Sequence, residues 1–397
     1  MPGSIISELY SFRRVRITAC RIVNDVLEIE LSPDKRFAPI CSCCGSRSGR
    51  IHSIRERRLR DLPASGYQVY LSCQQRLLWC DECRRIVVED LEFFDLYKRH
   101  TRRFARMVYD LCRIMTVQDV KNHLGLDWKT VKDIDRSFLE ENYMDPDYDD
   151  LRILAVDEIS LRKGHKYMTV VADHVRGRVI WLGCDRTSKT LHTFFDELSE
   201  EQKSSIEAVA MDMWQPYIGV VKRRLPAAEI VFDLFHVVSS FGRVIAHVRS
   251  LEYQKASEED KDVLKGTTFM LLRNTENLSE DQKEHLDKLL LLNSVLAKTL
   301  ILKEKLKQIW DCDHWTTARA RIMEWCSMAR SIGYRVLDSF AGMLERHSYG
   351  ILSHCRYSIH TGRIEGINNK IKVIKRKSYG FRDHNYFALK VIQAFSD

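Results

Sequence analysis

Beginning at residue 152, short apolar runs alternate with helical segments, and three of the runs are followed directly by an aspartate. Short apolar runs bounded by turn residues are typical of buried strands. Three strands come first, followed by a strand, a helix and a strand, and this order predicts an α/β fold, a mixed sheet covered by helices. We interpret as strands the residues 153–156, 167–172, 179–183, 206–211 and 229–232, with a helix at 190–198.

The aspartates that follow these strands are Asp157, Asp212 and Asp233. The strand order is that of a ribonuclease-H-like sheet, in which carboxylates at the ends of adjacent strands can bind divalent cations. Two such cations activate one oxygen and stabilise the leaving oxygen in phosphoryl transfer. Glu365 is the candidate for a third carboxylate, because it opens a helix rich in Lys and Arg. A single Asp after a strand more commonly caps a turn, so the metal interpretation depends on Asp157, Asp212 and Glu365 occurring together.

Two cysteine pairs near the N-terminus have the spacing of zinc ligands. Cys41 with Cys44, and Cys80 with Cys83, each form a C-x2-C pair that can bind one side of a tetrahedral zinc. Between the pairs, a turn and a strand at 67–71 predict a zinc ribbon with an extended hairpin. The alternative is four ordinary thiols, and the spacing does not decide whether Cys43 is also a ligand. No apolar signal core follows the N-terminus, so thiols or metal ligands are expected rather than disulfides.

Residues 116–138 have the pattern of a helix-turn-helix. Thr116 and Asp127 can each cap a helix, and Gly125 supplies the turn between the two helices. Lys129 and Lys132 lie on the outer side of the second helix, as in a helix that enters the major groove of DNA. Many helical pairs of this kind bind no DNA, so the neighbouring basic zinc module strengthens the interpretation.

The chain has 63 Lys and Arg against 55 Asp and Glu, and its positive charge is concentrated at the two ends. Lys and Arg exceed Asp and Glu by six in residues 1–110 and by six in residues 351–397, whereas the middle of the chain is mildly acidic. This distribution suggests a polyanion bound at both ends, although a solvated surface would give a similar count. The candidate DNA-binding residues are Arg55, Arg57, Arg58, Arg60, Arg102, Arg103, Lys129, Lys132, Arg363, Lys370, Lys372, Lys375, Arg376 and Lys377.

Between the last predicted strand and Glu365 lies a segment rich in Leu, Lys and Glu. Its leucines, among them Leu286, Leu289 and Leu296, recur at helical spacing and predict an all-helical insertion. The leucine stripe could instead form a dimer seam. No apolar run approaches the ~20 residues of a membrane-spanning helix. We expect a zinc-ribbon module at 1–95, a helix-turn-helix at 96–145, a catalytic domain at 150–240 and 356–397, and the helical insertion at 241–355.

Several motifs together closely resemble the ISL3 family of bacterial insertion-sequence transposases, which are DDE enzymes. The resemblance runs from about Cys41 to the C-terminus and includes the zinc-binding region and the helix-turn-helix. The motifs are AVDEIS at 155–160, RKGH at 162–165, MDMWQPY at 211–217, FDLFHV at 232–237, EGINNKIK at 365–372 and YGFR at 379–382.

The resemblance implies that Asp157, Asp212 and Glu365 are the catalytic triad and that they bind Mg²⁺ or Mn²⁺. Asp233 is the alternative second carboxylate. We rank it below Asp212 because Asp233 and His236 resemble the D/C-x-x-H motif that follows the second catalytic acid in related transposases. His236 would either position the DNA that is cut or brace the site.

The expected function is that of a DNA transposase that binds terminal inverted repeats and catalyses metal-dependent cleavage and strand transfer. Its partners would be the transposon ends, the target DNA and a second copy of the chain, with Zn²⁺ as a structural ion and the bacterial cytoplasm as its location. Two alternatives are a DNA-binding regulator on an inactive transposase scaffold and a metal-dependent nuclease that cuts without joining. The intact triad argues against the regulator, because binding alone does not need these carboxylates.

Overall fold

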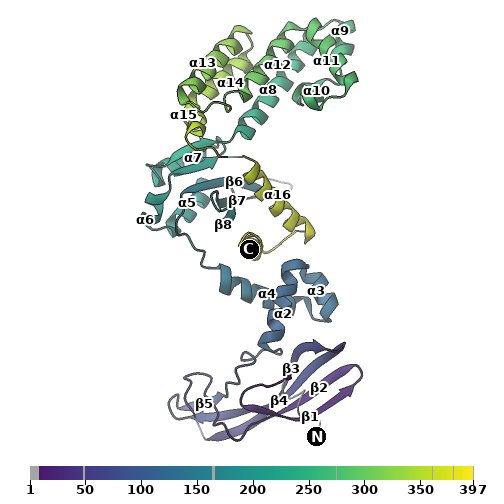
Figure 1. Ribbon diagram of the computed structural model, residues 1–397, viewed down its shortest axis with the longest axis vertical. Coiled ribbons are helices and arrows are strands. Elements are labelled where there is room, and N and C mark those ends of the chain that lie inside the picture. Colours follow the sequence, from purple (N-terminus) through teal and green to yellow (C-terminus); the bar gives the residue numbers. More distant parts are fainter. Residues whose placement is uncertain are drawn as a thin grey trace. The chain divides into compact units, whose positions relative to one another are not determined.

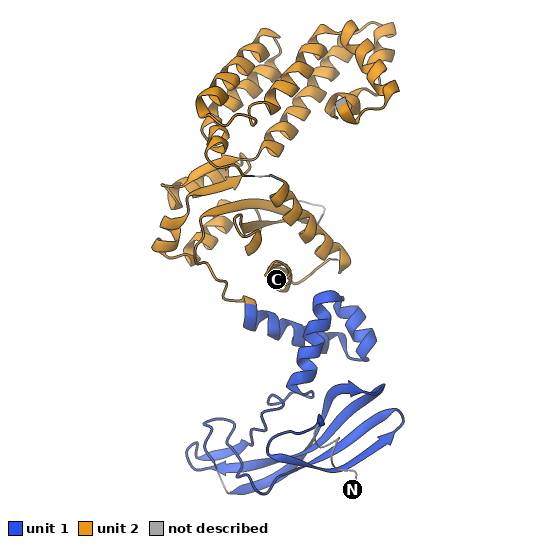
Figure 2. Ribbon diagram, viewed as in Figure 1, with its two compact units in different colours: residues 1–142 blue, residues 143–397 orange. Residues whose placement is uncertain are grey.

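The computed structural model describes residues 9–47, 50–162, 166–273, 275–359, 361–378 and 380–396. The chain forms two compact units, residues 1–142 and residues 143–397 (Figures 1 and 2). The finer division into five segments stays a prediction. Lys163, Gly164, His165 and Tyr379, which belong to the motifs quoted above, lie outside the described residues. No helix in the described ranges is long and apolar enough to cross a membrane.

The first unit contains a five-stranded sheet followed by helices. The strand order is β1-β2-β4-β3, with β5 paired to β4, and β3 and β4 form the long hairpin between the two cysteine pairs. This confirms the predicted zinc-ribbon hairpin. The elements are β1 (Val15–Val23), β2 (Val26–Pro33), β3 (Ile51–Ala64), β4 (Tyr67–Cys80), β5 (Arg85–Val88), α2 (Arg102–Ile114), α3 (Val117–Leu124) and α4 (Trp128–Tyr143).

β4 is much longer than the strand predicted at 67–71. Polar residues interrupt its apolar pattern, but two of them are buried and have partners. The side chain of Gln75 donates to the carbonyl of Glu89, and Arg76 forms a buried ion pair with the Glu89 carboxylate. A buried polar group is tolerated when it is hydrogen-bonded, so the strand continues through residues that the sequence marks as unfavourable.

The predicted helix-turn-helix is confirmed in α3 and α4. The Thr116 hydroxyl accepts from the amide of Asp119 and the Asp119 side chain accepts from the amide of Thr116, which is a capping box. Gly125 ends α3 in the left-handed conformation, with φ 65°. The carboxylate of Asp127 accepts from the amides of Lys129 and Thr130 at the start of α4.

The second unit contains a five-stranded mixed sheet with the order β10-β9-β6-β7-β8. β6, β7 and β8 are antiparallel neighbours, while β9 and β10 run parallel to β6. This confirms the predicted α/β sheet. The elements are β6 (Ile153–Arg162), β7 (Lys166–Asp173), β8 (Arg178–Cys184), α5 (Ser188–Glu197), α6 (Glu200–Ser205), β9 (Ala208–Met211), α7 (Gln215–Arg224), β10 (Glu229–Phe232), α16 (Thr361–Lys377) and α17 (His384–Ala394).

Each face of this sheet has its own core. Phe194 of α5 and Tyr217 of α7 are buried against one face. Ile364 and Ile367 of α16 are buried against the other face, together with Phe387 of α17. The sheet is therefore covered by helices on both faces, as expected for a layered α/β domain.

One prediction about the sheet is wrong: the first strand does not end at Asp157. β6 continues to Arg162, because Ile159 is buried in the core beneath α16 and β7 pairs with β6 along its length. Asp157 therefore lies within the strand.

The chain leaves the sheet after β10 and returns to it at α16 through a helical insertion (Figure 1). Leu286, Leu289 and Leu296 are buried in the core of the second unit, so the leucine stripe is covered by the chain's own helices. The elements are α8 (Leu234–Lys255), α9 (Glu258–Leu264), α10 (Thr268–Leu272), η1 (Thr275–Asn277), α11 (Glu280–Leu292), α12 (Ser294–Lys307), α13 (Trp315–Ser331), α14 (Arg335–Arg346), α15 (Ser348–Leu352) and η2 (Ser353–Cys355).

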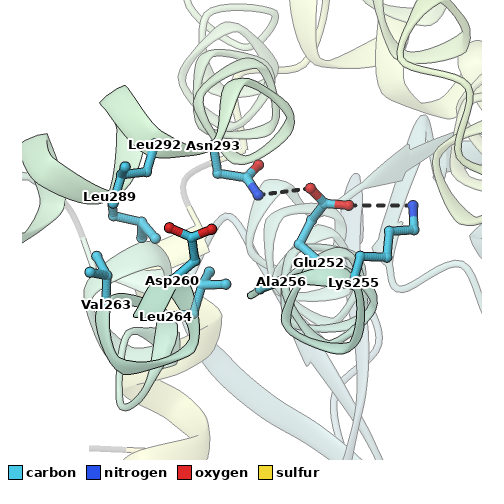
Figure 3. Close-up of a pocket in the computed structure, with 9 residues that line it drawn as sticks. All are labelled: Glu252, Lys255, Ala256, Asp260, Val263, Leu264, Leu289, Leu292 and Asn293. Atoms are coloured by element: carbon cyan, nitrogen blue, oxygen red, sulfur yellow. Dashed lines mark hydrogen bonds and ion pairs between the residues drawn. The ribbon is translucent and has the colours of Figure 1, made fainter. Parts of the chain in front are cut away.

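A buried carboxylate links several of the insertion's helices. Glu252 of α8 accepts hydrogen bonds from the Asn293 amide, at 2.7 Å, and from the Tyr334 hydroxyl. Lys255 lies 3.5 Å from the same carboxylate, beside a cavity of about 130 Å³ (Figure 3). The network satisfies a charge that would otherwise be costly to bury.

The end of the insertion packs tightly on the sheet. A Cβ atom added at Gly350 of α15 would lie 2.5 Å from the ring of Phe232, the last residue of β10. We therefore expect Gly350→Ala to lower the free energy of unfolding by about 1–3 kcal/mol, because the helix must shift away from the strand. Chemical denaturation followed by circular dichroism measures this change.

Gly219 of α7 provides the matched control, because an added Cβ there meets nothing within 4 Å. Gly219→Ala should leave the free energy of unfolding unchanged or raise it by up to about 1 kcal/mol. Equal stability of the two variants would contradict the close contact between α15 and β10.

Candidate metal and DNA-processing sites

Four cysteines of the first unit form a compact cluster. The sulfur atoms of Cys41, Cys44, Cys80 and Cys83 all lie within 4.8 Å of one another. Among the described residues, this is the one group of three or more possible metal ligands with such short separations. Four thiolates at this spacing suit tetrahedral zinc, so the cluster supports a structural zinc site.

Local backbone geometry brings the sulfurs together. The amide of Cys43 donates to the Cys41 sulfur and the amide of Cys83 donates to the Cys80 sulfur, both at 3.4 Å. Hydrogen bonds from Ser46 lower the pKa of Cys44 to about 6, whereas burial raises the pKa of Cys41, so the cysteines differ in how readily each forms the thiolate that zinc requires. Cys43 lies outside the cluster, and its sulfur is 3.2 Å from Nη2 of Arg85.

Three aspartates of the second unit lie in one row across adjacent strands. Ala155 of β6 is paired with Ala210 of β9, so extending the register by two residues brings Asp157 beside Asp212. In the same way, the last pair of β9 and β10 brings Asp212 beside Asp233. Parallel neighbours lie about 4.8 Å apart, so Asp212 stands between the other two.

Asp157 and Asp212 also extend from the same face of the sheet. Ala155 and Ala210, two residues before them, are both buried in the core beneath α16. Because side chains alternate along a strand, the two aspartates point toward the side of the sheet that α16 covers.

Backbone amides hold two of these carboxylates in place, and burial and neighbouring charges raise their pKa values. Asp212 accepts from the amide of Trp214 at 2.9 Å, and Asp233 caps α8 by accepting from the amide of Phe235 at 2.8 Å. Burial raises the pKa of Asp212, and the negative charges of Glu158 and Asp157 raise it further.

Burial likewise raises the pKa of Asp233, and the charges of Asp157 and Glu365 add to this increase. His236 acts in the opposite direction on both Asp233 and Asp212. The row is therefore a place where negative charge is crowded and a cation would be stabilised.

Glu365 is exposed on α16, and the same helix contacts Asp157 through Asn368. The Asn368 amide nitrogen donates to Oδ2 of Asp157 at 2.5 Å. α16 thus lies beside β6 (Figure 1), with Glu365 and Asn368 about one helical turn apart. The basic residues that follow Glu365 made it the candidate acid in the sequence, but no pattern there gave a role to Asn368.

The donor set fits a hard divalent cation, because carboxylate and amide oxygens are the ligands that Mg²⁺ and Mn²⁺ prefer. Among the described residues, no three of these carboxylates have oxygens within 4.8 Å of one another. That Asp157, Asp212 and Glu365 hold such an ion stays a prediction.

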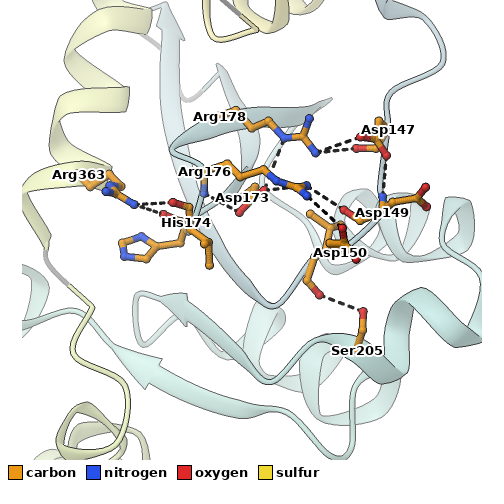
Figure 4. A network of polar contacts seen from close by, with 11 residues as sticks. Asp147, Asp149, Asp150, Asp173, His174, Arg176, Arg178, Ser205 and Arg363 are labelled. Atoms are coloured by element: carbon orange, nitrogen blue, oxygen red, sulfur yellow. Dashed lines mark hydrogen bonds and ion pairs between the residues drawn. The ribbon is translucent and has the colours of Figure 1, made fainter.

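Arg363 is anchored within the second unit. Its Nη1 donates to the carbonyls of His174 and Val175, at 2.5 and 3.0 Å, in the turn between β7 and β8 (Figure 4). Arg176 and Arg178 hold the far side of that turn by donating to the carbonyls of residues 149 and 147. The arginine therefore fixes the first turn of α16, two residues before Glu365.

The basic residues that follow Glu365 differ in their contacts and in their exposure. Lys370 donates to the carbonyl of Ala394, and Lys375 donates to the carbonyls of Ser160 and Leu161. Burial lowers the pKa of Lys375. Lys370, Lys372, Arg376 and Lys377 are exposed, whereas Lys375 is half-buried.

The predicted DNA-binding arginines of the first unit also have intramolecular contacts. Arg60 is buried and donates to Gln68, and Arg103 pairs with the buried carboxylate of Asp61. The others are more accessible: Arg55 bonds Gln75, Arg57 donates to the Lys98 carbonyl, Arg58 lies over the Tyr70 ring and Arg102 pairs with Asp95.

On the helix-turn-helix, Lys129 is exposed and Lys132 is half-buried, with its amine 5.6 Å from the Trp128 ring centre. That any of these arginines and lysines contacts DNA stays a prediction.

One group beside the acidic row was not expected from the sequence. Glu158, on the opposite face of β6 from Asp157, pairs with Arg186 at 2.7 Å. The guanidinium lies over the rings of Tyr167 and Trp214, at 4.4 and 4.9 Å from their centres. The doubled acid at 157–158 was a possible signal for Glu158, but no local pattern indicates Arg186.

Matches to known protein families extend over most of the chain. A family model described as a transposase matches residues 154–391. A helix-turn-helix domain of transposase family ISL3 matches residues 89–139, and a zinc-finger of the transposases of IS204, IS1001, IS1096 and IS1165 matches residues 38–83.

Two curated relatives extend over nearly the same length. The transposase for insertion sequence element IS1001 of Bordetella parapertussis is 37% identical over 372 residues, which cover 93% of this chain and 91% of the relative. The transposase for IS1557 of Mycobacterium tuberculosis is 27% identical over 367 residues, covering 86% of this chain and 82% of the relative.

We expect the double variant Cys80→Ser/Cys83→Ser to lose bound zinc, because only one pair of thiolates remains. Elemental analysis of the purified protein should give about one zinc per chain for the unchanged protein and almost none for the variant. Cys43→Ser is the matched control and should keep its zinc. Retention of zinc by the double variant would show that these cysteines are not the ligands.

Removing the anchor of α16 should loosen the start of that helix. In Arg363→Ala, we expect backbone amides in the first two turns of α16 to exchange hydrogen about tenfold faster, because two charge-assisted hydrogen bonds are lost. Hydrogen-exchange mass spectrometry measures the change. Arg376→Ala, an exposed arginine on the same helix, should leave these amides unchanged, and equal exchange in both variants would contradict the anchoring role.

Proposed function

The chain belongs to the ISL3 family of DDE transposases, and we propose that it binds the terminal inverted repeats of its insertion sequence and cuts and joins DNA there. Membership in this family makes it an insertion-sequence transposase and an enzyme, and its helix-turn-helix implies DNA binding. The reaction steps, the DNA sites and the residues that act on them are our proposals.

Asp157, Asp212 and Glu365 are the proposed catalytic carboxylates. The observation that supports this assignment is the strand register: extended two residues past its last pair, Ala155 with Ala210, it brings Asp157 beside Asp212 on the face that α16 covers. When bound there, Mg²⁺ or Mn²⁺ would activate a water or a DNA 3′-hydroxyl and stabilise the leaving oxygen.

Each proposed site residue has a separate task. Asp157 and Asp212 supply carboxylate oxygens from the rigid sheet, and Glu365 supplies a third carboxylate from α16. Asp233 caps α8, the first helix of the insertion, and His236 lies in the first turn of that helix. We assign these two residues an accessory role in bracing the site or positioning the DNA strand.

DNA recognition is proposed to be divided between the two units. The zinc module and the helix-turn-helix, with Lys129 and Lys132, would read the terminal repeats. In the second unit, exposed Lys372 and Arg376 would contact phosphates without regard to sequence. Because two transposon ends must be joined, we propose that the protein acts as a dimer on DNA in the bacterial cytoplasm.

We expect Asp157→Ala to abolish both cleavage and joining while DNA binding is retained. Removing a carboxylate that holds the metal should slow cleavage by about a thousandfold or more. The assay incubates the full chain with the element's ends, a target plasmid and Mg²⁺, and separates the products on a gel. A mobility-shift assay with the same ends measures binding.

Asp196→Asn is the matched control, because Asp196 is an exposed acid on α5 that pairs with Arg224. It should leave both products unchanged. Equal products from Asp157→Ala and the unchanged protein would refute the triad assignment. Cleavage without joining by the unchanged protein would favour a nuclease, and binding without cleavage would favour a DNA-binding regulator.

A further inference from the structure

Asn368 of α16 has two different amide environments. Its nitrogen donates to Oδ2 of Asp157 at 2.5 Å, whereas its oxygen, Oδ1, is buried and has no hydrogen-bond partner among the described residues. The orientation follows from chemistry, because an ionised carboxylate only accepts hydrogen bonds and must face the amide NH₂ group. Asp157 therefore forces the oxygen of Asn368 to point elsewhere.

A buried acceptor without a donor is unfavourable. Native proteins satisfy the great majority of such atoms, and the exceptions commonly mark a functional site or a bound ion or water. The oxygen of Asn368 is thus available to an ion or a water from outside the described chain.

The position of Asn368 indicates which ligand this is. Residues three apart on a helix share a face, so Asn368 and Glu365 project from the same side of α16. Ile364, Ile367 and Ile371 are buried and hold this helix against the sheet. The amide is consequently fixed beside the acidic row, where negative charge is already crowded.

We propose that Asn368 positions Asp157 and that its Oδ1 is a further oxygen ligand for the divalent cation, an inference that rests on the proposed metal site. Amide oxygens are normal ligands of hard divalent cations. A neutral ligand completes the oxygen set without adding a negative charge to the row. The site would then combine three carboxylates with one amide.

The test measures Mn²⁺ binding to the full-length protein without DNA, by following the electron paramagnetic resonance signal of the unbound ion. We expect Asn368→Ala to weaken Mn²⁺ binding about tenfold or more. Asn369→Ala, the exposed neighbour on the same helix, is the matched control and should bind Mn²⁺ as the unchanged protein does.

Asn368→Asp provides a second readout that needs no activity. It keeps an oxygen at this position but replaces the donor to Asp157 with a repelling charge. We expect a lower thermal unfolding temperature without Mn²⁺ and a larger rise on adding Mn²⁺ than in the unchanged protein. A rise on adding Mn²⁺ no larger than in the unchanged protein would contradict the ligand role.

Asp157→Ala separates this inference from the proposed function. If that variant binds Mn²⁺ normally, the proposed metal site is wrong. If Asp157→Ala loses Mn²⁺ while Asn368→Ala binds it with unchanged affinity, the metal site stands and the role of Asn368 is refuted. If Asn368→Ala fails to fold, the Mn²⁺-dependent change in the unfolding temperature of Asn368→Asp decides the question.

Discussion

The burial of carboxylates side by side in one row of a sheet is the electrostatic cost that the second unit must offset. Burial and neighbouring charges raise the pKa values of Asp212 and Asp233, so the fold must keep these groups in place against an electrostatic cost. The hydrophobic cores on the two faces of the sheet hold in place the strands that carry this row. The local hydrogen bonds from Trp214 and Phe235 then hold the side chains.

The helical insertion separates Asp233 from Glu365 in the sequence, yet the charge of Glu365 contributes to the raised pKa of Asp233. Its first helix begins at Asp233, and its last helices pack on β10, where Gly350 leaves room for Phe232. The insertion is thus attached to the sheet at both of its ends. Distortion of these helices would change the placement of the strand end that precedes Asp233.

Local patterns made much of this structure predictable. Apolar runs identified the strands, and the last of them, β10, matches its predicted bounds; the C-x2-C spacing identified the zinc cluster. Features that depend on distant partners were missed. From the sequence, Arg60 and Arg103 were expected at the surface as DNA-binding residues. In the structure, Arg60 donates to Gln68 and Arg103 pairs with Asp61, both within the first unit. The orphaned oxygen of Asn368 likewise depends on α16 meeting β6, which no local pattern indicates.

The anchor of α16 has a consequence for sequence change and engineering. Arg363 contacts the carbonyls of residues 174 and 175, and main-chain carbonyls are present whatever side chains these positions carry. The exposed side chain at position 175 can therefore vary while the contact with Arg363 remains, provided that Arg176 and Arg178 still hold the backbone path of the turn. Gly177, with φ 70°, is the residue in this turn whose replacement would alter that path.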